Sequence, residues 1–130
     1  MPIPGPDRMP VTGAISRSGG KIVLLGGGSH CRIVLDVLRS AGGYQVSGIT
    51  DLKTREGTTV LGDYKISHVD SDLDALLPEV SFAFVSLGYD LALRRSLYLT
   101  AKGIGYEFPI LVSPHSYLSP YAKVGEGTLI

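Results

Sequence analysis

The residues best suited to binding chemistry form the stretch GGGSH at 26–30, between an apolar run and a helical pattern. A strand that ends in glycines and opens into a helix directs free backbone N–H groups and the positive end of the helix dipole at one point. Gly26 and Gly28 match the first two glycines of the G-x-G-x-x-G fingerprint, but Cys31 stands at the third. The stretch alone is equally compatible with a phosphate contact and with a plain strand-to-helix turn.

Two residues further along the chain favour the phosphate reading. Asp51 ends a predicted strand 23 positions after Gly28, near where nucleotide-binding folds place an acidic side chain against ribose or base. Gly88 ends the apolar run at 80–88, which we expect to lie beside the first strand, where a side chain would obstruct a ligand. Each residue could serve only a turn. Together with the glycine loop they favour a shared nucleotide site at the carboxyl edge of a sheet.

The remaining reactive residues have simpler explanations. His30 stands at a predicted helix start, where its imidazole could donate to a phosphate or sugar hydroxyl or could simply be exposed to solvent. Cys31 is better suited to packing between helix and sheet than to reaction. His68 and His115 have no metal-ligand spacing to another candidate. We therefore predict no metal site in this chain.

An alternation of strands and helices must position these residues. Strands are predicted at 21–25, 44–50, 80–88 and 106–112, and the apolar runs in the first and third of these are typical of strands buried on both faces of a parallel sheet. Helical spacing and capping signals predict helices at 31–41, 71–79 and 91–102, and a short strand or hairpin is predicted at 58–68. Asp90 should cap the last helix and Gly103 should end it. The pattern predicts an α/β fold, a small Rossmann-like, doubly wound parallel sheet with flanking helices.

Composition excludes several classes of protein. The chain has 130 residues with 44% hydrophobic content, enough for one globular domain. Its 12 basic and 12 acidic residues cancel, which argues against nucleic acid or an anionic membrane as a partner. One cysteine and no apolar stretch of about 20 residues favour a cytoplasmic location. Residues 1–20, rich in proline and glycine, are predicted to be a flexible extension.

An apolar residue recurs every six positions near the end of the sequence, at Val112, Leu118, Val124 and Ile130. This is the register of a left-handed hexapeptide β-helix, in which three six-residue faces form one triangular coil. Residues 113–130 provide about one coil, and one coil cannot form an independent solenoid because stacked repeats bury one another's faces. We therefore expect the sequence to be a fragment that ends just after the repeat begins, although the coil could instead pack on the domain or on another subunit.

The ordered segments resemble the N-terminal part of the bacterial nucleotide-sugar and sialic acid acetyltransferases, which include UDP-4-amino-sugar N-acetyltransferases. The resemblance extends over residues 21–130 and rests on KIVLLGGGSHCRIVLDVL, GITD, TTVLGDYKI, FVSLG and SPHSYLSPYAKVGEG. It implies a nucleotide-sugar-binding domain at 21–112 and the start of a β-helix at 113–130. Together with Gly26 from the glycine motif, it implies that substrate is bound by Gly28, Ser29, His30, Asp51, Leu52 and Gly88. Ser29 replaces the usual glycine and Leu52 replaces a second acidic residue, which leaves the sugar and nucleotide open.

The resemblance also implies an activity for the full-length protein. Members transfer acetyl from acetyl-CoA to an amino or hydroxyl group of a nucleotide-activated sugar in glycan biosynthesis, as homotrimers that bind acetyl-CoA between subunits. Their general-base histidine would lie beyond Ile130, and His115 matches a linker histidine instead. We expect this chain to bind a UDP-linked sugar without transferring acetyl alone. The alternative is a non-catalytic regulatory module that binds a nucleotide or CoA, which has no need of a six-residue repeat.

Overall fold

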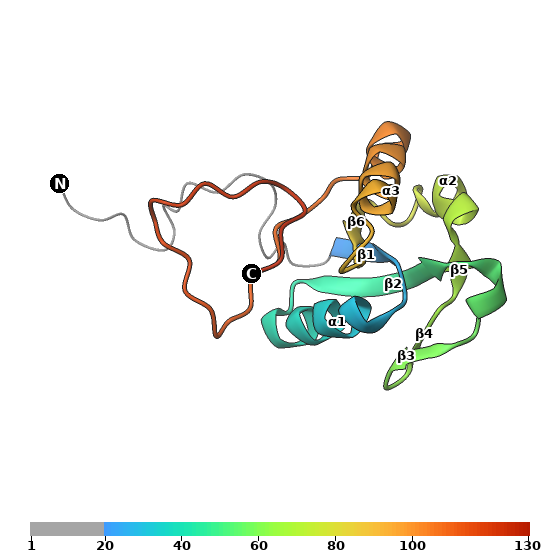
Figure 1. The fold of residues 1–130 in the computed structure, drawn as a ribbon, viewed down its shortest axis with the longest axis horizontal. Coiled ribbons are helices and arrows are strands. Elements are labelled where there is room, and N and C mark those ends of the chain that lie inside the picture. Colours follow the sequence, from blue (N-terminus) through green and yellow to red (C-terminus); the bar gives the residue numbers. More distant parts are fainter. Residues whose placement is uncertain (1–19) are drawn as a thin grey trace.

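A four-stranded parallel sheet forms the centre of the computed structural model, which describes residues 20–130 (Figure 1). Its strands, in spatial order, are β5 (His68–Val69), β2 (Tyr44–Asp51), β1 (Gly20–Leu25) and β6 (Phe82–Val85). The order reverses at β1, because β2 lies on one side of it and β6, much later in the chain, on the other. Open parallel sheets bind ligands at such a switch point. The extension predicted at 1–20 falls almost wholly outside the described residues.

Both faces of the sheet are covered, which explains the continuous apolar run of β1. Ile22 and Leu24 pack in the cluster that includes helix α1 (Ser29–Ala41), whereas Val23 and Leu25 pack in the cluster on the opposite face. All four side chains are fully buried. Since successive side chains of a strand point to opposite faces, a strand covered on one face only would have alternated apolar and polar residues. The predicted Rossmann-like α/β fold is confirmed.

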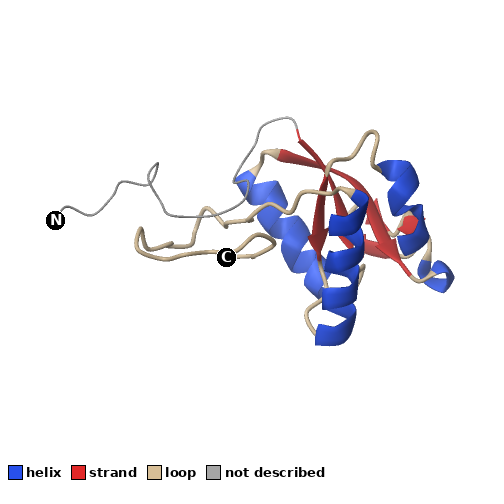
Figure 2. Ribbon diagram, turned by 90° about the horizontal axis from the view of Figure 1, so that it is seen from above, coloured by secondary structure: helices blue, strands red, loops and turns tan. Residues whose placement is uncertain are grey.

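Helices form the two outer layers (Figure 2). Helix α1 covers one face and buries Cys31, Val34, Leu35 and Leu38, a spacing of three and four residues that gives it an apolar stripe. Helices α2 (Leu73–Leu76) and α3 (Leu91–Ile104) cover the other face. The sheet thus has α1 on one side and α2 with α3 on the other, as in a doubly wound fold.

The helix boundaries differ from the prediction in three places. The helix predicted at 71–79 extends only over Leu73–Leu76, after a 3-10 turn at Asp70–Asp72. Helix α1 begins at Ser29, two residues earlier than expected, because Gly28 already serves as its N-cap. Asp90 caps α3 as predicted, and its side chain accepts the N–H of Leu93 at 3.1 Å. The predicted end at Gly103 is wrong, since the helix continues to Ile104 and the glycine with positive φ is Gly105.

The hairpin predicted at 58–68 is confirmed, and the strand predicted at 106–112 is wrong. Strands β3 (Thr59–Leu61) and β4 (Tyr64–Lys65) pair antiparallel around a turn that contains Gly62 at φ +56°. In the segment 106–112 only isolated bridges form, from Glu107 to β6 and from Leu111 to a later segment. Pro109 lies between them without a backbone N–H to donate, so a regular ladder cannot form.

Residues 113–130 trace a three-sided loop that returns beside its own start (Figure 1). Leu111 pairs in parallel with Leu129, 18 positions later, and the N–H of Ile130 donates to the carbonyl of Leu111 at 2.8 Å. This spacing equals three six-residue faces. A single bridge is not a β-helix, however, and the β-helical coil stays a prediction. Glu126 fastens the loop to α3, because its Oε2 accepts from the hydroxyl of Tyr98 at 3.2 Å and from Nζ of Lys102 at 3.1 Å.

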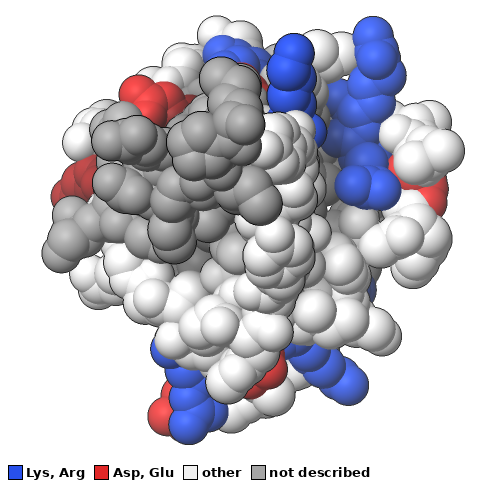
Figure 3. Space-filling view, turned by 90° about the vertical axis from the view of Figure 1, so that its left-hand side faces the viewer, with Lys and Arg blue, Asp and Glu red and all other residues white. Residues whose placement is uncertain are grey.

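The face of the molecule that carries this loop has mixed charges. Lys and Arg side chains stand near its upper and lower edges with acidic groups close by, and uncharged side chains fill the centre of the part that the described residues form (Figure 3). Among residues 20–130, neither α1 nor α3 is long and apolar enough to cross a membrane, and no other helix is.

Candidate functional site

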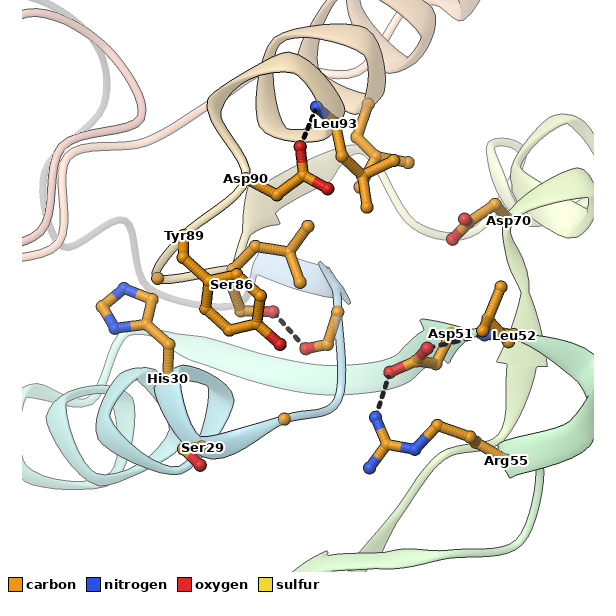
Figure 4. Close-up of a pocket in the computed structure, with 15 residues that line it drawn as sticks. Ser29, His30, Asp51, Leu52, Arg55, Asp70, Ser86, Tyr89, Asp90 and Leu93 are labelled. Carbon is orange, nitrogen blue, oxygen red and sulfur yellow. Dashed lines mark hydrogen bonds and ion pairs between the residues drawn. The ribbon is translucent and has the colours of Figure 1, made fainter.

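A cavity of about 320 Å³ lies where the strand order reverses, at the carboxyl ends of β1, β2 and β6 (Figure 4). All seven residues that the sequence singles out line it: Gly26, Gly28, Ser29 and His30 from the first loop and helix, Asp51 and Leu52 from the end of β2, and Gly88 after β6. They gather because parallel strands end at one edge of a sheet. That they contact a ligand remains a prediction.

The three glycines of the first loop have different structural reasons. Gly26 has φ +114°, and a Cβ there would lie 2.5 Å from Cδ2 of Leu87. A Cβ on Gly27 would lie 2.6 Å from Cγ1 of the buried Ile66. At Gly28 a Cβ would have no such neighbour within 4 Å. Packing therefore requires the first two glycines, whereas Gly28 leaves its backbone open to the cavity.

No side chain caps the amino end of α1, and the carboxylate of Asp51 binds the N–H of Gly27, before the helix begins. Its N-cap, Gly28, has no side chain to accept the first N–H groups, and the first turn contains no acidic residue. The first N–H groups of a helix have no intrahelical partner and carry the positive end of the dipole. This end of the cavity is therefore suited to an anionic group.

Asp51 holds the loop from the end of β2. Its Oδ2 accepts the N–H of Gly27 at 2.9 Å and Nη1 of Arg55 at 2.8 Å, and its Oδ1 accepts the N–H of Leu52 at 2.7 Å. An ionised carboxylate offers about four acceptor positions. One position on Oδ1 thus remains for a ligand hydroxyl, and Asp51 can fix the loop and contact a ligand at once.

His30 and Gly88 lie next to each other in the wall of the cavity. His30 is the second residue of α1 and is partly buried. A Cβ on Gly88 would lie 3.2 Å from Cβ of His30 and 3.6 Å from its Nδ1. The nearest group that a side chain at position 88 would meet is therefore His30 itself, so the close approach of these two residues already accounts for the glycine.

Several cavity residues were missed by the sequence analysis: Arg55, Asp70, Ser86, Tyr89 and Asp90. Arg55 follows β2 in a short 3-10 turn, Lys53–Arg55, which has no apolar periodicity to predict it. Ser86 is fully buried, and its hydroxyl donates to the carbonyl of Gly26 at 2.6 Å. Tyr89 is 81% exposed at the rim. Asp90 has φ +60°, which places it in the left-handed region at the start of α3, a position that the sequence revealed only as a helix cap.

The other reactive side chains are structural. Cys31 is fully buried in the cluster beneath α1, and burial raises the pKa of its thiol to about 11, so it packs as a neutral group, as predicted. His68 lies at β5 with its Nδ1 2.7 Å from Oγ of Ser67, and His115 is exposed in the C-terminal loop. Neither lines the cavity. Residues 20–130 contain no group of three or more His, Cys, Asp or Glu side chains that could hold a metal ion.

A parallel sheet with helices on both faces, a glycine loop after β1 and a cavity at the switch point define a Rossmann-like domain. Residues 21–100 match the model of one family of such domains, the PglD N-terminal domain. The chain belongs to this family, which confirms the resemblance to the N-terminal domains of nucleotide-sugar acetyltransferases.

Solved structures of sugar acetyltransferases share the fold. A mutant of perosamine N-acetyltransferase from Caulobacter crescentus, solved with CoA and GDP-perosamine, is 29% identical with a TM-score of 0.75, over 87% of this chain and 52% of that one. PerB from the same organism, solved with the same two ligands, is 31% identical with a TM-score of 0.74 and the same coverage. The acetyltransferase domain of PglB from Neisseria gonorrhoeae, with acetyl coenzyme A, is 26% identical with a TM-score of 0.71, over 85% and 53%.

The present chain thus spans about half the length of these structures. No match was found among curated proteins.

Proposed function

We propose that this chain is the nucleotide-sugar-binding part of a sugar N-acetyltransferase. The observation that carries the proposal is the cavity at the switch point, which adjoins the uncapped amino end of α1 and is lined by all seven residues that the sequence analysis assigned to ligand binding. Membership of the PglD N-terminal domain family supports it, as does the likeness to two structures solved with GDP-perosamine.

The cavity offers a complementary group for each part of such a ligand. Backbone N–H groups at Gly28 and the first turn of α1 would bind a phosphate, since no side chain caps them. His30 would donate to a phosphate or a sugar hydroxyl. The free acceptor position of Asp51 would take a ribose hydroxyl, and Leu52, 66% exposed, would offer apolar contact.

Acetyl transfer is proposed for the complete protein that the relatives exemplify. The amino nitrogen of the sugar would attack the thioester carbon of acetyl-CoA, so that the C–N bond forms and the C–S bond breaks. A base would take the proton lost by nitrogen and pass it to the departing thiolate sulfur, so that CoA leaves as the thiol. We assign residues 21–112 the binding of the nucleotide sugar and residues 113–130 the start of the β-helix, and we give no residue of 20–130 a catalytic role. We further propose that the complete protein is a homotrimer and that it acts in the cytoplasm, in glycan biosynthesis. Light scattering on the complete protein tests the trimer.

This proposal has two forms, which differ in the nucleotide that is linked to the sugar. The resemblance of the sequence implies a UDP sugar, whereas two of the similar structures were solved with GDP-perosamine. Calorimetric titration of the protein with GDP-perosamine, a UDP-4-amino sugar, NADH and CoA would distinguish them. Binding of either nucleotide sugar supports the proposal, and the one that binds shows whether the nucleobase is guanine or uracil. Binding of NADH or CoA without either nucleotide sugar would instead indicate the regulatory module.

Two histidine variants, one in the cavity and one outside it, test the site directly. His30→Ala should weaken binding of the nucleotide sugar without lowering the melting temperature, because the side chain lines the cavity and is only partly buried. His115→Ala is the matched control, since that histidine is exposed and lies outside the cavity. Equal affinity of the two variants would remove His30 from the site.

A further inference from the structure

A second cavity, of about 340 Å³, adjoins the candidate site. The two share His30, Leu87 and Gly88, so they meet at the contact between His30 and Gly88. The second cavity is completed by Arg94 of α3 and by residues 127–129 of the C-terminal loop. A ligand longer than a nucleoside could therefore extend from the first cavity into the second.

The charges of the first cavity favour one direction for such a ligand. Asp51, Asp70 and Asp90 line it, and its one arginine, Arg55, is already bound to Asp51. Carboxylates accept hydrogen bonds from ribose hydroxyls and base N–H groups but repel a diphosphate. The nucleoside therefore suits this acidic part, and the diphosphate suits the side toward α1 and the second cavity.

Arg94 forms no ion pair with any of the residues that the structure describes. Within residues 20–130 the ion pairs are Arg55–Asp51 and Lys102–Glu126. Glu126 shares a further cavity with Arg94, but its Oε2 is bound by Lys102 and Tyr98. A partly buried guanidinium without a carboxylate retains its donors for an external oxyanion, and its planar fork suits phosphate oxygens.

We propose that Arg94 binds the diphosphate of the nucleotide sugar, and that the sugar passes over the His30–Gly88 contact into the second cavity. This inference rests on the proposed function and deepens it. Arg94 then determines affinity for the charged part of the ligand and has no effect on the nucleoside. Residues 127–129 bring the C-terminal loop to the sugar end of the same site.

Titration of native protein, Arg94→Gln and Arg95→Gln with GDP, UDP, guanosine, uridine and both nucleotide sugars tests the inference. Arg95 is the matched control, because it follows Arg94 directly in α3, is exposed and lines neither of the two cavities. Arg94→Gln should lose at least tenfold in affinity for the diphosphates and less than twofold for the nucleosides. Arg95→Gln should match native protein, and Arg94→Lys should recover part of the loss.

The outcomes separate the two proposals. If native protein binds a nucleotide sugar and Arg94→Gln binds it equally well, the role of Arg94 is refuted while the proposed function stands. An equal loss of nucleoside and diphosphate affinity would also refute it, since that pattern indicates a disturbed fold or site. If native protein binds neither nucleotide sugar, the proposed function fails and the inference fails with it.

Discussion

Alanine at Gly27 should destabilise the domain, because the loop packs against a buried side chain there. A Cβ on Gly27 would lie 2.6 Å from Cγ1 and 2.7 Å from Cδ1 of Ile66, about 1 Å inside the optimum for two carbon atoms. Ile66 is 1% exposed, so it cannot turn into solvent. Overpacking of this kind costs about 1–3 kcal/mol, and the free energy of unfolding should fall by that amount.

Gly28 provides the matched control in the next position. Its φ of −95° and ψ of −156° are extended, and a Cβ would meet open space. Alanine at this position would restrict the unfolded chain and so stabilise the domain by roughly 0.4–1 kcal/mol. Alanine is also a poorer N-cap than glycine, which would offset roughly half a kcal/mol or more of that gain. The net change in stability should stay within about 0.5 kcal/mol. The added methyl group would stand beside the N–H groups of the loop, so Gly28→Ala should lose affinity for the nucleotide sugar.

Urea denaturation followed by circular dichroism measures the first effect, and calorimetric titration measures the second. The expected result is a loss of stability in Gly27→Ala and a loss of binding without a loss of stability in Gly28→Ala. If Gly27→Ala were as stable as native protein, the packing of Ile66 would not fix the loop. If Gly28→Ala kept native affinity, the loop would be a plain turn.

Three further variants test buried groups. Because burial raises the pKa of Cys31 from 9.0 to about 11, the folded state keeps a proton that the unfolded state loses, so melting temperature should fall as pH rises through that range, and less so in Cys31→Ala. Tyr106→Phe removes a buried hydroxyl that donates to the carbonyl of Leu73 at 2.7 Å and should cost about 1 kcal/mol in urea unfolding. Ser86→Ala leaves the Gly26 carbonyl without its donor and should cost about 1–2 kcal/mol; an unchanged midpoint would contradict that role.

The part of the fold that the sequence predicted correctly depends on local signals. The run at 22–25 is apolar at every position because β1 is buried on both faces, and α1 follows from its apolar stripe and from Gly42, whose φ of +71° suits the end of a helix. Once β1 and β6 are neighbours, the geometry of a parallel sheet brings Asp51 and Gly88 to the glycine loop.

The missed features depend on contacts between distant segments. Arg55 enters the site because a 3-10 turn after β2 brings Nη1 within 2.8 Å of Asp51, and no periodic pattern marks that turn. Residues 127–129 of the C-terminal loop fold back and line the second cavity together with Arg94. A pattern of six-residue repeats does not predict where these residues lie. The apolar segment at 106–112 resembles a strand in composition, yet its residues fill the core from an irregular backbone, with Tyr106 1% exposed.

The glycine loop shows why a motif can be both a turn and a site. Sequence alone treats GGG as one feature, and its missing third fingerprint glycine counts against a dinucleotide. In the structure Gly26 is needed for its positive φ and Gly27 for its contact with Ile66, so both would be required in a domain that bound nothing. Gly28 has neither constraint. Asp51 accepts three hydrogen bonds from the protein and keeps a fourth acceptor position. Within this loop, the groups left for the proposed ligand are therefore the backbone of Gly28 and that remaining acceptor position of Asp51.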